Sequence, residues 1–75
     1  MNAQIIADDA DMIVAGYAFK VFDKYTEVTD LSNLSKTSVI QNDEIVESVM
    51  SDEEDDIVMK YYTKNKDLLK ETTNA

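Results

Sequence analysis

The clearest pattern of apolar and polar positions lies in the last third of the chain and has the spacing of an amphipathic helix. Ser51 is followed three residues later by Glu54, which is the capping box that marks a helix N-terminus. Acidic residues fill the first turns and lysines follow, with Asp56 and Lys60 spaced as an i, i+4 ion pair, so the charges follow the helix dipole. We therefore predict a helix over residues 52–71. The stripe expected to face the core consists of Ile57, Val58, Tyr61, Tyr62, Asn65, Leu68 and Leu69.

Residues 37–50 have the pattern of a β-hairpin. Its turn would lie at Asn42–Asp43, because both residues tolerate the left-handed backbone conformation that a two-residue turn requires. A helix capped by Asn42 is the alternative, but it leaves Val39 and Ile40 without a partner, so we favour the hairpin. The predicted cross-strand pairs are Gln41 with Glu44, Ile40 with Ile45, and Val39 with Val46.

Residues 12–22 fit two patterns. A helix here would be apolar nearly all round, which does not suit so small a domain. Enrichment in aromatic and β-branched residues favours a strand, with Gly16 at a bulge or bend. The residues expected to alternate onto one face of that strand are Ile13, Ala15, Tyr17, Phe19 and Val21. A further strand is predicted at residues 25–29, after a tight turn at Asp23–Lys24.

Together these elements predict an α+β fold, in which three to four antiparallel strands form a small sheet and the C-terminal helix packs on one face. We expect a single domain over residues 1–75, with a lead-in at 1–11 and a tail at 72–75 that fray. The alternative architecture is a three-helix bundle, which follows if residues 12–22 and 37–50 are helical.

Composition then narrows the chemistry. The 75 residues include no cysteine and no histidine, so no disulfide, thiolate metal site or imidazole base can form. Seven lysines face sixteen acidic residues, and the formal net charge is -9. Repulsion from phosphates disfavours direct binding to nucleic acid or to an anionic membrane surface. We see no signal peptide and no apolar stretch that could span a bilayer, so we expect a cytoplasmic protein.

Five consecutive carboxylates, at residues 52–56, begin the predicted helix. They do not resemble an EF-hand loop, which spaces its acids alternately around a glycine, and neighbouring acids on a helix point away from one another. We therefore expect no metal site and no cofactor. We also expect no enzymatic activity, because the remaining carboxylates, tyrosines, lysines and hydroxyls form no recognisable catalytic set.

The acidic run instead suggests a binding surface. Between residues 43 and 56 there are eight acidic residues and no basic one, and such a field attracts basic proteins, although it can also simply keep a small protein soluble. Our first hypothesis is a non-enzymatic protein-binding module that imitates a nucleic-acid backbone and inhibits or regulates a basic, nucleic-acid-binding protein. Phages and mobile elements commonly encode small acidic proteins of this type, which is an analogy only. The candidate partner-binding residues are Glu44, Glu47, Asp52, Glu53, Glu54, Asp55 and Asp56.

The second hypothesis is a small structural or regulatory homo-oligomer without a charge-driven partner. Its contacts would come from the open face of the sheet or from the helix stripe. Two adjacent tyrosines cannot both be fully buried in a core this thin, so the candidate contact residues are Tyr61, Tyr62 and Leu69. A homodimer would also double the acidic surface, so the two hypotheses are compatible.

Overall fold

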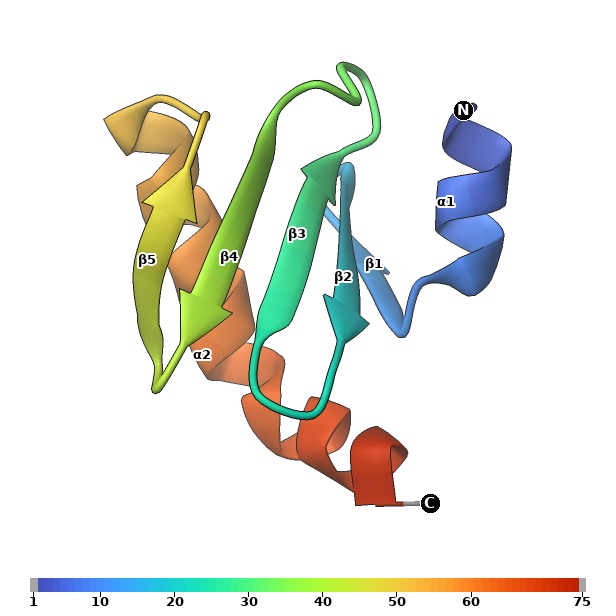
Figure 1. The fold of residues 1–75 in the computed structure, drawn as a ribbon, viewed down its shortest axis with the longest axis vertical. Helices are drawn as coiled ribbons and strands as arrows, with labels where there is room; N and C mark the ends of the chain where they lie inside the picture. Colours follow the sequence, from blue (N-terminus) through green and yellow to red (C-terminus); the bar gives the residue numbers. More distant parts are fainter. Residues whose placement is uncertain (1, 75) are drawn as a thin grey trace.

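A five-stranded antiparallel sheet with one long helix across a face makes up the body of the molecule (Figure 1). The computed structural model describes the backbone of residues 2–74 and the side chains of residues 2–69. The strands follow one another in the sheet in the order of the chain. The elements are α1 (Ala3–Asp9), β1 (Met12–Val14), β2 (Tyr17–Val21), β3 (Thr26–Asp30), β4 (Thr37–Gln41), β5 (Glu44–Ser48) and α2 (Asp52–Asn74). The predicted α+β fold is confirmed with one or two strands more than expected, and the three-helix bundle is wrong.

The core lies between α2 and the face of the sheet that it covers. Strand residues alternate between faces, so each strand sends every second side chain towards α2. The most deeply buried of these apolar side chains are those of Phe19, Val28 and Ile40, and Val58 of α2 meets them; all four are at most 1% exposed. Tyr17, Met50, Tyr62 and Leu69 complete the cluster.

Residues 12–22 form two strands and not the single strand that we predicted. Ala15 and Gly16 have φ angles of 54° and 83°, so they form a two-residue turn of the type that suits the right-handed twist of a hairpin. The turn reverses the chain and changes which residues share a face. Val14 pairs with Tyr17 on the α2 side, whereas Ile13 pairs with Ala18 on the opposite side and is 50% exposed.

The predicted turn at Asn42–Asp43 is confirmed, with φ angles of 55° and 64°. Gln41 pairs with Glu44 and Ile40 with Ile45, as expected. The third predicted pair is wrong, because Val39 pairs with Glu47 and the register shifts at this point. Val46 is the extra residue of a bulge on β5, and its side chain is 56% exposed.

The turn between β2 and β3 lies at Asp23–Lys24, as predicted. The Phe22 amide donates to the Tyr25 carbonyl oxygen at 2.8 Å, and the two rings stack with their centroids 4.8 Å apart. Asp23 and Lys24 have no positive φ angle, so this turn is free of the strain of a left-handed backbone.

Both ends of the chain contain more helix than we predicted. Residues 3–9 of the expected lead-in form α1, whose Ile5 amide donates to the Asn2 side chain at 3.0 Å as an N-cap. Helix α2 continues to Asn74, so residues 72–74 of the expected tail are helical, while residue 75 lies outside the described residues. The buried stripe of α2 is narrower than predicted, since Ile57 and Leu68 are 41% and 62% exposed.

Candidate protein-binding surface

The capping box at the start of α2 also connects the helix to the sheet. The Glu54 amide donates to Ser51 Oγ at 3.2 Å, and the Ser51 amide donates back to Glu54 Oε1 at 3.5 Å. The same carboxylate accepts from Lys36 Nζ at 2.9 Å and from the Tyr17 hydroxyl at 3.4 Å. The hydrogen bond from Lys36 lowers the pKa of Glu54, while burial and then the nearby charge of Glu54 raise the pKa of Tyr17. The Glu54 carboxylate therefore has three partners within the fold, which are Ser51, Lys36 and Tyr17.

Asp55 is occupied as well, through two serine hydroxyls. Ser38 Oγ and Ser48 Oγ donate to Asp55 Oδ1 at 2.9 and 2.8 Å, and the two hydroxyl oxygens lie 2.9 Å apart. Ser38 is only 1% exposed, so its hydroxyl depends on a partner inside the protein. Asp55 thus fastens the first turn of α2 to β4 and β5, which is a structural task that we did not predict from the sequence.

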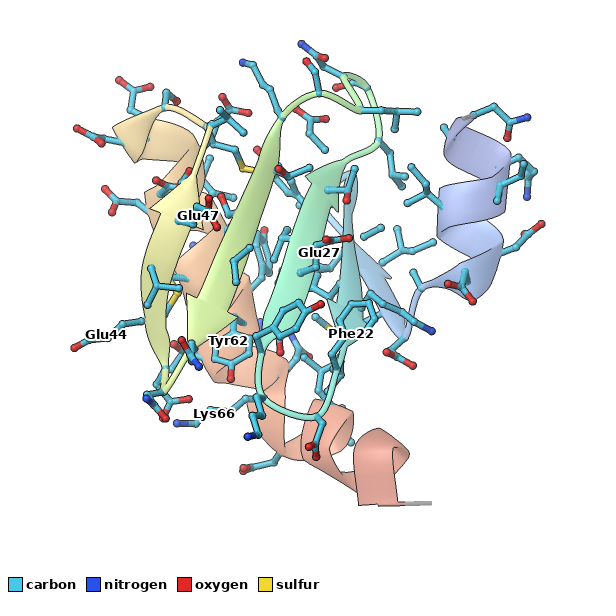
Figure 2. The ribbon with its side chains drawn as sticks, viewed as in Figure 1. Phe22, Glu27, Glu44, Glu47, Tyr62 and Lys66 are labelled. Atoms are coloured by element: carbon cyan, nitrogen blue, oxygen red, sulfur yellow. The ribbon has the colours of Figure 1, made fainter. Side chains whose placement is uncertain are left out.

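Asp43, in the turn between β4 and β5, binds to the middle of α2. Its carboxylate accepts from the Tyr62 hydroxyl at 3.2 Å and from Lys66 Nζ at 3.4 Å. Burial raises the pKa of Tyr62, and the charge of Asp43 raises it further. Tyr62 and Lys66 lie at the lower end of the sheet in Figure 2, away from the start of α2. Asp43 therefore belongs to a different cluster from the acids at residues 52–56.

The other five acids of this region are exposed. Glu44 and Glu47 project from β5, the edge strand at the left of the molecule in Figure 2. Glu44 lies at the lower end of this strand, next to Asp43, and Glu47 lies nearer its upper end, where α2 begins. The hydrogen bond from Ser48 to Asp55 holds the two elements together. We call this surface the acidic edge, which consists of Glu44, Glu47, Asp52, Glu53 and Asp56.

Lysines do not neutralise the acidic edge. The ion pairs among the described side chains are Lys20–Asp9, Lys36–Glu54 and Lys66–Asp43. The predicted pair between Asp56 and Lys60 does not form. Lys60 Nζ lies instead 5.9 Å from the centre of the Tyr61 ring. The acidic edge therefore keeps its negative charge. It contains five of the seven partner-binding residues that we predicted.

The residues predicted to form an oligomer contact lie mostly in the core. Tyr62 is 8% exposed and Leu69 is 3% exposed, and both contact the buried face of the sheet. Tyr61 is half-buried at the margin of the core. All three residues belong to the stripe of α2 that we predicted to face the core. The curvature of the helix surface decides how closely each of them approaches the sheet.

Neither a metal site nor a membrane span is found in the described part of the chain. No three acidic side chains among residues 2–69 are grouped so that they could hold a metal ion. Neither of the two helices, as far as they are described, is long and apolar enough to cross a bilayer.

Comparison with known protein families gives one match. The model of a family of unknown function, DUF7723, matches residues 1–69. The chain belongs to this family. No curated protein and no solved structure matches the chain significantly. The family description names no activity, so a functional assignment has to rest on the geometry of the molecule.

Proposed function

We propose that the protein is a non-enzymatic binding module whose acidic edge docks on a basic, nucleic-acid-binding protein and so inhibits or regulates it. The supporting observation is the separation of the acidic residues into two groups. Glu54, Asp55 and Asp43 bind other residues of the same chain, whereas none of the lysines whose side chains are described lies within ion-pair distance of the five acids of the edge.

Electrostatics favour an encounter at this edge. Five exposed carboxylates on two adjoining elements produce a concentrated negative field, and the remaining net charge of the chain adds to it. A field of this kind steers a positively charged surface and discriminates against acidic proteins. We propose the cytoplasm as the setting of this interaction, consistent with a chain that contains no cysteine.

The test is a binding experiment with two triple variants of equal charge. The edge variant carries Asp52→Asn, Glu53→Gln and Asp56→Asn. The matched control carries Asp8→Asn, Asp23→Asn and Asp67→Asn, three exposed acids outside the edge. Both variants have a formal net charge of -6, since each loses three of the sixteen negative charges.

Proteins from the native cell are captured on the wild-type chain, identified by mass spectrometry, and the purified partner is then titrated against all three forms. We expect a basic partner whose affinity falls about tenfold or more with the edge variant and changes little with the control. Affinity should also fall steeply as salt is added. Equal losses with both variants, or binding that is insensitive to salt, would exclude the acidic edge as the docking surface.

A further inference from the structure

A groove separates α1 from the face of the sheet that α2 leaves open. It has a volume of about 510 Å³, which is within the range of small-molecule sites. Its apolar lining comes from both walls, namely Ile5, Ile6, Ala10, Ala18, Phe22 and Leu34. No part of this lining belongs to the acidic edge, so the groove is a separate candidate for binding.

The side-chain hydrogen bonds between the α1 region and the sheet, among the described residues, lie at the C-terminal end of the helix. Lys20 Nζ donates to the Asp9 carbonyl oxygen at 2.9 Å and lies 3.5 Å from the Asp9 carboxylate. Asp11 Oδ2, just after the helix, accepts from the Val21 amide at 2.7 Å. Helix α1 has no fully buried residue, and its Ile5 side chain is 58% exposed. The apolar side of α1 thus faces the groove and is only partly buried.

The floor of the groove carries one carboxylate without a partner. Glu27 lies directly opposite Lys20 across the β2–β3 pair, where an ion pair would be the ordinary arrangement. Lys20 binds Asp9 instead, and no other described side chain bonds to the Glu27 carboxylate. Glu27 is half-buried near the middle of β3 in Figure 2. The charges of Lys20 and Asp9 cancel, so the groove has a net charge of one negative unit, from Glu27.

We propose that this groove binds a small amphiphilic amine, a molecule with one aliphatic or aromatic body and one cationic group. The body would lie between Ile5 and Ala18, where its burial removes apolar surface from water. The cationic group would form the ion pair with Glu27 that Lys20 does not form. An anionic amphiphile of the same length would meet the Glu27 carboxylate and the negative field of the whole chain, so it should be rejected.

The test is a titration of the nitrogen-15-labelled chain with octylammonium, followed by the backbone amide signals. We expect saturable shifts confined to α1, β2 and β3. Butylammonium should bind roughly a hundredfold more weakly, since each methylene contributes a factor of about three to four. Octanoate should give no saturable shift. Shifts that gather at the acidic edge, equal binding of octanoate, or no saturable binding of octylammonium would overturn the proposal.

Three variants test the assigned residues. Glu27→Gln should weaken octylammonium binding about tenfold, because it removes a charge-assisted contact. Asp67→Asn removes the same charge from an exposed site on α2 and should change the affinity less than twofold. Ile5→Ser should also weaken octylammonium binding. Because Ile5 is exposed, this substitution should leave the fold intact, so weaker binding could not be attributed to unfolding. Unchanged affinity in both Glu27→Gln and Ile5→Ser would overturn the assignment, and it would leave the proposed function of the acidic edge untouched.

Discussion

At the residue scale, adjacent carboxylates of one run have different tasks because an α-helix turns by about 100° from one residue to the next. Glu54 and Asp55 point towards the sheet, where a lysine, a tyrosine and two serines bind them. Asp52, Glu53 and Asp56 point to solvent. The run therefore combines helix capping, attachment to the sheet and surface charge within five positions.

The neighbours Asp55 and Asp56 provide a direct test of this division. Asp55→Ala should lower the free energy of unfolding by about 1–3 kcal/mol, because the buried Ser38 hydroxyl loses its carboxylate acceptor. Asp56→Ala, at an exposed site, should change it by less than about 0.5 kcal/mol. Urea unfolding followed by circular dichroism measures both values. Similar values for the two variants would show that Asp55 does not fasten α2 to the sheet.

At the scale of elements, two hairpin turns use the same backbone geometry with different residues. Asn42 and Ala15 both occupy the first turn position with φ near 55°. Asparagine tolerates this conformation because its short polar side chain can hydrogen-bond locally, whereas alanine places Cβ too close to a carbonyl oxygen. The turn residues of the β1–β2 hairpin thus favour the turn conformation less than those of the β4–β5 hairpin do. Packing of the β1–β2 hairpin on α2 offsets this weaker preference.

Placing asparagine at position 15 and, in a separate variant, alanine at position 42 should change the free energy of unfolding in opposite directions. Ala15→Asn should raise the free energy of unfolding by about 0.5–1 kcal/mol, since it creates the Asn-Gly sequence that such turns prefer. Asn42→Ala should lower it by about the same amount, for the reverse reason. Thermal and urea unfolding of the two single variants measure these changes. A loss of stability in Ala15→Asn would contradict the turn geometry at Ala15–Gly16.

At the scale of the whole molecule, the net charge and the form of the two edge strands of the sheet oppose association between copies of the chain. Each chain has a formal net charge of -9. The edge strand β1 has only three residues, and the other edge strand, β5, carries Glu44, Glu47 and the bulge at Val46. Short edges, charged side chains and bulges are the features by which natural sheets avoid pairing with one another.

We therefore expect a monomer of 8.5 kDa in solution. Sedimentation equilibrium at about 0.02 M and about 0.5 M sodium chloride tests this, because high salt screens the repulsion between copies. Tyr62 and Leu69, two of the three predicted contact residues, are in the core, whereas Ile57 and Leu68 of α2 are exposed. A dimer that persists at high salt would support the homo-oligomer hypothesis in place of a charge-driven partner.

Features that depend on neighbouring residues could be predicted from the sequence. Ser51 and Glu54 predicted the start of α2 because a capping box is a contact within one helical turn. Asn42–Asp43 predicted a turn for the same local reason. The candidate site was predicted only as an acidic region, since a count of carboxylates says nothing about which of them find a partner.

The order of residues by itself determined the α+β class, the turn at Asn42–Asp43 and the position of α2, because each follows from local backbone preference and hydrophobic period. The tertiary structure decided which carboxylates remain free. The hydroxyls of Ser38 and Ser48 and the ammonium of Lys36 reach Asp55 and Glu54 only after distant segments are brought together by burial of the core. Long-range packing likewise placed Lys20 on Asp9 and left Glu27 unpaired, which no spacing along the chain could indicate.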